Sequence, residues 1–182
     1  MQWMASYAIT HHRPLHFRRT SDGATTITHV DASQADQPDM ASHYGYWQRC
    51  CNASLRWRAF SGHQVHAATR GPELVASVAG THVSMYQRLL MYEARLGRLP
   101  GDIVMPLGMD NRASLANSTA DNIHLGSCHL AIRIGVIRQA VRDLIIRPYY
   151  INTNQNVADT MTKPTDKKRV LAFTPMMYGK RK

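Results

Sequence analysis

The sequence is short of acidic residues. Of its 182 residues only 12 are Asp or Glu, against 22 Lys and Arg, and the formal net charge is +10. Only two of the acids, Glu73 and Glu93, are glutamates. This excess of positive charge favours a polyanionic partner over a basic one, because opposite charges attract at long range and binding releases counterions.

Cysteine and long apolar runs are also scarce. The three cysteines, Cys50, Cys51 and Cys128, form no CxxC pair, and adjacent cysteines rarely bridge each other. We interpret them as small apolar side chains of a protein in a reducing compartment, and not as zinc ligands or members of a disulfide framework. No apolar run approaches the ~20 residues of a membrane span, and no secretory apolar segment is present. We therefore expect an intracellular protein of the cytoplasm, nucleus or mitochondrion, without a membrane partner.

The length suits one domain with basic ends. The N-terminal stretch has no acid before Asp22 and carries Arg13, Arg18 and Arg19. That composition fits an organellar transit peptide and also a plain basic arm, and the arm is slightly favoured. Three parts are expected: a basic arm over residues 1–23, a folded domain over 24–165 and a basic C-terminal tail over 166–182.

The periodicity of the apolar residues predicts an alternation of strands and helices. Strands are expected over residues 24–33, 42–49, 54–60, 102–109 and 145–152, and helices over 69–97, 111–118, 127–144 and 156–164. Pro148 within the last strand indicates an edge position, because proline cannot donate to a strand ladder. The order predicts an α/β fold that begins with a hairpin meander and continues with βαβ crossovers.

Four of the scarce acids stand near the ends of these expected elements. Asp31 and Asp110 come at strand ends, and Glu73 and Asp159 come in the first turns of helices. Strand ends and helix starts can meet at one rim of a sheet, and a helix N-terminus favours an anion. Two Mg²⁺ ions about 3.5–4 Å apart need about this many carboxylate oxygens. Each acid alone fits a cap or a surface charge equally well, but the four together favour a metal site.

Several segments resemble, in order and with similar spacing, the ribonuclease H domain of Ty1/copia-type retrotransposon polyproteins. The most specific is PYYINTNQNVADTMTKP at residues 148–164, which is similar to the Tyr-rich strand, the Asn-Val-Ala-Asp segment and the Thr-Lys-Pro that end this domain. The others are VDASQADQPDMASHYGYW (30–47), SLRWRAFSGHQVHAATRGPELVAS (54–77), MDNRASLANS (109–118) and HLAIRIGVIRQAVRDLII (129–146). The resemblance covers about residues 24–168.

The resemblance implies a ribonuclease H-like fold, in which a five-stranded mixed sheet is flanked by helices. It carries the family's four catalytic, metal-binding carboxylates onto Asp31, Glu73, Asp110 and Asp159. It also implies cleavage of the RNA strand of RNA–DNA hybrids with two Mg²⁺ or Mn²⁺ ions. The residues expected to contact nucleic acid are Asn111, Arg138, Arg142, Lys163, Lys167, Lys168 and Arg169. An N-cap is an equally good interpretation of Asn111, and a solvated basic face is an alternative for the arginines.

Departures from the family pattern leave a second function open. Ser33, Gln34 and Ala131 stand where the family has other residues, which indicates drift in the hybrid-binding surface. The chain starts at its own Met1 and holds no polymerase motif, so we expect an excised domain or a relict encoded alone. A relict could serve as a non-catalytic RNA-binding subunit of a ribonucleoprotein, such as a mitochondrial ribosome, with structured RNA as its partner. The retained carboxylates favour the enzyme.

Overall fold

The computed structural model describes residues 14–18, 26–34, 41–62, 70–94, 103–120 and 130–179. Cys128 and most of the expected basic arm lie outside these residues. The strands are β1 (Thr26–Ser33), β2 (Ser42–Cys50), β3 (Ala53–Gly62), β4 (Met105–Met109) and β5 (Ile146–Tyr150). The helices are α2 (Arg70–Glu93), α3 (Arg112–Thr119), α4 (Ala131–Arg142), α5 (Asp159–Thr162) and α6 (Lys167–Tyr178), with a short 3₁₀ turn η3 (Thr153–Gln155).

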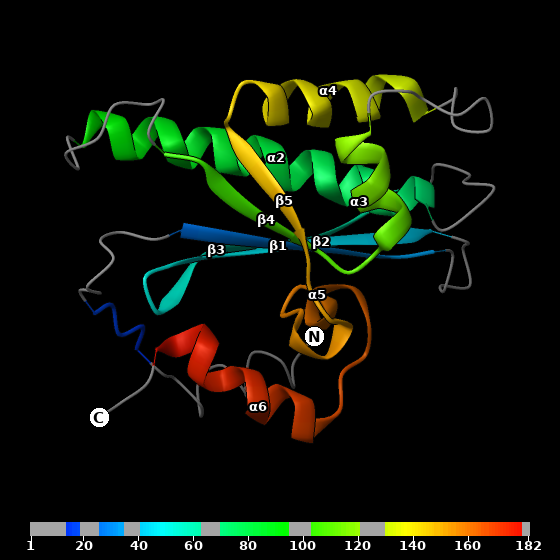
Figure 1. The fold of residues 1–182 in the computed structure, drawn as a ribbon. Coiled ribbons are helices and arrows are strands. Elements are labelled where there is room, and N and C mark those ends of the chain that lie inside the picture. The colour runs from blue at the N-terminus through cyan, green and yellow to red at the C-terminus, as the bar shows by residue number, and fades with distance from the viewer. Residues whose placement is uncertain are drawn as a thin grey trace.

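The strands form one mixed sheet in the order β3-β2-β1-β4-β5. The first three strands pair antiparallel as a meander, whereas β1 pairs with β4 and β4 with β5 in parallel. Helices α2, α3 and α4 lie on one side of this sheet, and α5 and α6 lie on the other (Figure 1). The predicted five-stranded mixed sheet is therefore confirmed, and β5 with Pro148 is an edge strand, as the sequence predicts.

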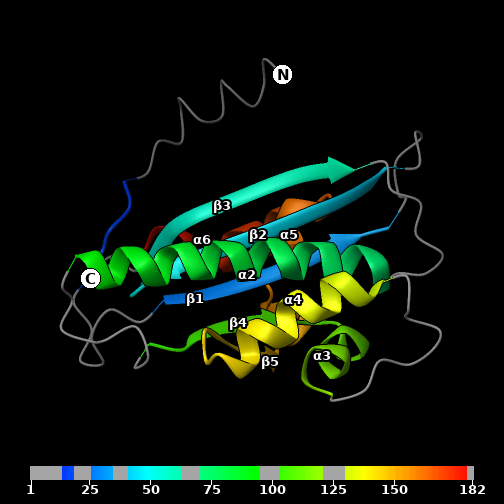
Figure 2. The ribbon, with the colours of Figure 1, turned by 90° about the horizontal axis from the view of Figure 1, so that it is seen from above.

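Apolar side chains fill the space on both faces of the sheet. Helices α2 and α4 cover one face of the sheet (Figure 2). Val30, Leu107 and Ile134 are fully buried in the core cluster on this side. On the opposite face, Trp47 and Phe173 pack in a second cluster with residues of the turn before α5. Burying one such side chain stabilises the fold by about 1.5–3 kcal/mol. None of the helices in the described ranges is long and apolar enough to cross a membrane.

The C-terminal segment differs from the expected basic tail. Residues Lys167–Tyr178 form α6, whose Phe173 side chain is only 3% exposed and packs on the sheet. Asp166 caps this helix by accepting a hydrogen bond from the Arg169 amide at 2.7 Å. The segment therefore contains a helix cap and a buried apolar side chain besides its basic residues, and the packing of Phe173 attaches the helix to the rest of the fold.

The last helix expected from the sequence, over residues 156–164, is shorter than expected. The structure has η3, then a turn around Asn156, and then the four-residue helix α5. The buried Asn156 side chain donates to the Val30 carbonyl at 2.9 Å and accepts from the Ala158 amide at 3.1 Å. These bonds to β1 and to the local backbone replace helical hydrogen bonds, which is why the helix begins later.

Gly80 lets α2 approach the sheet closely. A Cβ atom at this position would lie 2.3 Å from Cγ1 of Val30 and 3.0 Å from Cδ1 of Leu107. From the sequence alone this glycine is only a cost to the helix, but the structure explains it by the close contact of α2 with β1 and β4. Glu73, about two turns earlier in α2, is thereby held near the ends of these strands.

We expect Gly80→Ala to lower the free energy of unfolding by up to about 2 kcal/mol. Overpacking of a tight contact costs about 1–3 kcal/mol, and the better helix propensity of Ala offsets about 1 kcal/mol. Gly135→Ala in α4 is the matched control, because an added Cβ there meets no atom within 4 Å. It should instead stabilise the protein slightly. Urea denaturation of the two variants checks this, and equal stabilisation of both would contradict the close contact.

Candidate functional site

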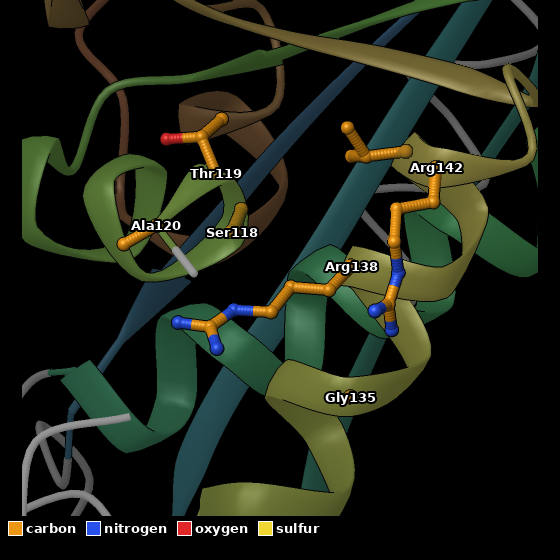
Figure 3. A pocket seen from close by; sticks show the side chains of 7 residues that line it. Ser118, Thr119, Ala120, Gly135, Arg138 and Arg142 are labelled. Atoms are coloured by element: carbon orange, nitrogen blue, oxygen red, sulfur yellow. The ribbon is translucent and has the colours of Figure 1, made fainter. Parts of the chain in front are cut away.

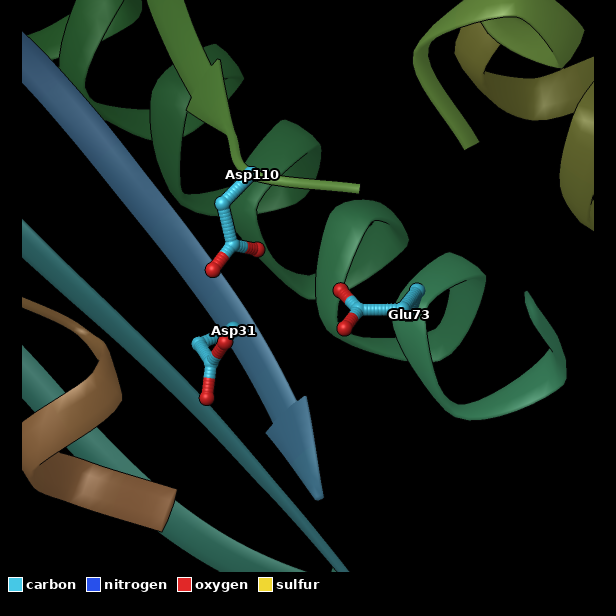
Figure 4. Close-up of side chains that lie close together, drawn as sticks. All are labelled: Asp31, Glu73 and Asp110. Atoms are coloured by element: carbon cyan, nitrogen blue, oxygen red, sulfur yellow. The ribbon is translucent and has the colours of Figure 1, made fainter. Parts of the chain in front are cut away.

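Three of the four expected carboxylates converge at the carboxyl ends of β1 and β4. The parallel register pairs Val30 with Met109, so that the next residues, Asp31 and Asp110, lie side by side. Glu73 reaches them from the first turn of α2 (Figure 4). One carboxylate oxygen of each residue lies within 4.8 Å of the others. Strand register and helix approach together create this cluster.

Asp31 lies at the centre of the site and is almost fully buried. Its side chain is 1% exposed. Oδ2 accepts a short hydrogen bond from the Thr162 hydroxyl, whereas Oδ1 is buried and has no hydrogen-bond partner in the part of the chain that the structure describes. Burial raises the pKa of Asp31 to about 6. The Thr162 bond and the Lys163 charge oppose this rise, and the nearby carboxylates of Asp110 and Asp159 add to it. A further cation beside Asp31 would favour its ionised form.

Glu73 is even more strongly affected. The residue is 8% exposed. Burial, followed by the charges of Asp31 and Asp110, raises its pKa to about 9. Its place at a helix N-terminus, which favours an anion, does not compensate for the loss of water and the like charges. Without a cation, Glu73 is protonated at neutral pH.

The cluster fits a hard divalent cation. Three carboxylates present oxygen ligands at short range, and Oδ1 of Asp31 is a buried acceptor that no donor of the described chain satisfies. An oxygen-only set of ligands suits Mg²⁺ or Mn²⁺ rather than zinc. A bound cation would oppose the effects of burial and like charge that raise the pKa values of Asp31 and Glu73.

Asp159 lies beside the cluster but has different partners from those expected. Its side chain is 3% exposed, and both oxygens are engaged in ion pairs. Oδ1 lies 2.6 Å from Nζ of Lys163, and Oδ2 lies 2.7 Å from Nη1 of Arg169. Partial burial lowers the pKa of Lys163, but its contacts with Asp159 and Asp31 raise it overall, so that the ammonium stays charged. A role for Asp159 as a metal ligand stays a prediction.

Residues that the sequence-based reasoning did not select hold these carboxylates in place. The Thr153 hydroxyl donates to Oδ2 of Asp110 at 3.0 Å, and Thr162 donates to Asp31. Gly45 of β2 admits α5 at close range, because a Cβ there would lie 2.7 Å from Cβ of Met161. Thr153 and Thr162 belong to the segment 148–164, and membership of that segment is the only sequence signal for them.

Among the residues expected to contact nucleic acid, some are exposed at the surface and others have contacts within the fold. Lys167 and Lys168 are exposed in the first turn of α6 and remain candidates for phosphate contacts. Asn111 caps α3, since its Oδ1 accepts from the Ser114 amide at 3.0 Å, so the N-cap interpretation is confirmed. A nucleic-acid contact for Asn111 stays a prediction.

Arg138 and Arg142 line a cavity of about 220 Å³ between α3 and α4 (Figure 3). Nε of Arg138 donates to the Asn117 carbonyl at 2.8 Å, near the C-terminal end of α3, where a cation is favoured by the helix dipole. Arg142 is exposed, and its Nη2 lies 3.4 Å from Oε1 of Gln139. Arg138 thus has a structural role in addition to any contact with nucleic acid, whereas Arg142 presents its charge at the surface.

The sheet order, the flanking helices and the site at the ends of β1 and β4 define a ribonuclease H-like fold. An N-terminal RNase H domain from Mycobacterium tuberculosis, solved as a fusion with maltose-binding protein, matches with a TM-score of 0.56 and 11% identity over 82% of this chain and 99% of that chain. LC11-RNase H1 in complex with an RNA/DNA hybrid matches with a TM-score of 0.56 and 12% identity over 76% of this chain and 94% of that chain.

A third similar structure is RNase H1 from the halophilic archaeon Halobacterium salinarum, with a TM-score of 0.54 and 11% identity over 76% of this chain and 94% of that chain. No protein-family model and no curated protein matches the sequence. At such low identities the solved structures establish the fold. The resemblance to Ty1/copia ribonuclease H therefore rests on the sequence segments.

The stability of the metal-free protein should fall as the pH rises. The folded-state pKa of Glu73 is raised from 4.5 to about 9 and that of Asp31 from 3.8 to about 6. The folded protein therefore keeps protons that the unfolded chain releases, and the stability present below about pH 4 is lost progressively up to about pH 9. Urea unfolding in EDTA across this range measures the effect.

Glu73→Gln should flatten this pH dependence, since the amide has no proton to lose. Glu93→Gln is the matched control, because Glu93 is exposed at the end of α2. Saturating Mg²⁺ should restore the stability of the parent at high pH but not that of Glu73→Gln to the same extent. An unchanged pH dependence in Glu73→Gln would contradict the buried, repelled state of this carboxyl group.

Proposed function

We propose that the protein is a divalent-metal-dependent endonuclease that cleaves the RNA strand of RNA–DNA hybrids, as its resemblance to the Ty1/copia-type ribonuclease H domain implies. One observation carries the proposal: Asp31, Glu73 and Asp110 converge within an RNase H-like fold, and Oδ1 of Asp31 is buried without a hydrogen-bond partner among the described residues. Placing the buried Asp31 and Glu73 carboxylates beside each other and beside Asp110 is costly unless a cation neutralises them. This cost points to a functional use of the cluster.

A bound Mg²⁺ or Mn²⁺ ion would supply Lewis acidity, which activates water and stabilises charge on phosphodiester oxygens. The chain's own contribution is to hold the ligands rigidly. Asp31 and Asp110 stand on adjacent strands, and Glu73 stands on the helix that packs on these strands. Thr153 and Thr162 orient two of the carboxylates, because they donate hydrogen bonds to Oδ2 of Asp110 and to Oδ2 of Asp31.

The proposed substrate class rests on the basic charge and on the fold. LC11-RNase H1, which has a similar fold, is solved in complex with an RNA/DNA hybrid. The net charge of +10 favours phosphate contacts in this chain, for which the exposed Lys167 and Lys168 are candidates. Contacts with 2′-hydroxyl groups would distinguish the RNA strand from DNA.

A second candidate is a non-catalytic RNA-binding subunit of a ribonucleoprotein. The observation that favours it is the state of Asp159, whose two oxygens are paired with Lys163 and Arg169 as in a purely structural ion pair. Both candidate functions predict salt-sensitive binding of RNA, so a binding experiment does not distinguish between them. Only the nuclease expects metal-dependent cleavage.

The parent protein should cleave a labelled RNA–DNA hybrid in the presence of Mg²⁺ and should leave a DNA duplex of the same sequence intact. Asp110→Asn should reduce cleavage by at least about 100-fold, because the loss of one carboxylate ligand weakens the binding and orientation of the ion. Asp143→Asn is the control: Asp143 is exposed after α4 and bonds Gln139 rather than the cluster. Gel analysis of the products gives the rates.

Absence of metal-dependent cleavage by the parent would contradict the nuclease. Salt-sensitive binding of structured RNA and co-purification with a large RNA-containing particle would then support the ribonucleoprotein subunit. Equal rates for the parent and Asp110→Asn would show that cleavage arises elsewhere, for example from a contaminating nuclease.

A further inference from the structure

The ammonium group of Lys163 lies between two of the four expected metal-binding carboxylates. Its Nζ is 2.6 Å from Oδ1 of Asp159 and 3.5 Å from Oδ2 of Asp31. A magnesium ion that bridged the same two oxygens would need to stand about 2.0–2.1 Å from each of them. The ammonium group already occupies that gap, and two cations at such short range repel each other strongly.

The structure holds this arrangement from several sides. Lys163 follows Asp159 by four residues, so that the turn of α5 places both side chains on one face. Arg169 fixes the other oxygen of Asp159 and also donates through Nη2 to the Thr153 carbonyl at 2.5 Å. Asp159 therefore cannot turn toward the cluster without breaking two ion pairs.

The available oxygen ligands also divide into two sets. Both oxygens of Asp159 are paired, and Oδ2 of Asp31 bonds Thr162 and faces Lys163. Oδ1 of Asp31 accepts no hydrogen bond from any described residue, and the cluster of Asp31, Glu73 and Asp110 provides ligands for one ion. The ligands thus suffice for a single divalent cation on the α2 side of Asp31.

The balance of charge in the site also indicates one divalent ion. When all four carboxylates are ionised they carry four negative charges, and Lys163 and Arg169 supply two positive charges next to them. The remaining two negative charges match one divalent ion. A second ion would leave the buried site with an excess of positive charge, which is costly in a region of low water content.

We infer that this site binds one divalent ion, at Asp31, Glu73 and Asp110, and that the Lys163 ammonium takes the place of a second ion between Asp31 and Asp159. The role of the ion in cleavage rests on the proposed function, whereas the number of ions does not depend on it. The inference replaces the expectation of two ions, and it gives Asp159 the role of positioning Lys163. Lys163 is then a fixed cation beside the substrate phosphates rather than a general surface contact.

Counting of bound Mn²⁺ by calorimetry and by electron paramagnetic resonance tests this in the free, full-length protein. The parent should bind one ion. Lys163→Met should bind two, the second more weakly, because Oδ1 of Asp159 and Oδ2 of Asp31 become available. Lys163→Arg, which keeps the charge, should again bind one. Lys168→Met removes an exposed lysine of α6 and should also bind one.

The dependence of hybrid cleavage on Mg²⁺ concentration gives a second measurement with substrate present. The parent should show a Hill slope of about one, and Lys163→Met should show lower cleavage at low Mg²⁺ that recovers at high Mg²⁺ with a slope approaching about two. Circular dichroism confirms that each variant is folded. Recovery at high Mg²⁺ also excludes simple misfolding of Lys163→Met.

Two ions in the parent, or one ion in both the parent and Lys163→Met, would overturn the inference. No ion in the parent would overturn both the inference and the proposed nuclease. One ion in the parent and two in Lys163→Met, without any cleavage, would support the inference and contradict only the proposed nuclease. The ion count therefore tests the inference, and the cleavage assay tests the proposed nuclease, so that the two hypotheses can fail independently.

Discussion

The parallel pairing of β1 with β4 determines the position of every other part of the site. Because Val30 pairs with Met109, the carboxylates of Asp31 and Asp110 become neighbours at the edge where both strands end. A shift of the register by one residue would turn one carboxylate to the other face of the sheet. Glu73 joins them because Gly80 allows α2 to pack directly on these two strands.

The site combines two ways of neutralising buried carboxylates. On the α2 side, Asp31, Glu73 and Asp110 have few donors, so that burial and mutual repulsion raise the pKa values of Asp31 and Glu73. On the α5 side, Asp159 is neutralised by Lys163 and Arg169. Asp31 belongs to both sides, since it is a member of the carboxylate cluster and its Oδ2 also lies near Lys163. This asymmetry distinguishes a half of the site that could bind a metal ion from a half in which the chain itself supplies the positive charges.

The C-terminal part of the chain supports the site rather than merely adding positive charge. Helix α6 is anchored by Phe173 and capped by Asp166, and it carries the Arg169 that fixes Asp159. The turn before α5 is joined to β1 through Asn156. Changes in α6 far from the carboxylate cluster are therefore coupled to the site through Asp159 and Lys163.

The sequence by itself determined the order of strands and helices as far as β5, the edge position of Pro148 and the choice of Asp31, Glu73 and Asp110 as candidate site residues, because periodicity, proline chemistry and element ends are local properties. Only the tertiary structure decided that Asp159 pairs with Lys163 and Arg169 and that residues 167–178 form a packed helix. These outcomes depend on which groups meet across the fold. An isolated Lys or Asp in a sequence does not specify whether its partner is water, a metal ion or another side chain.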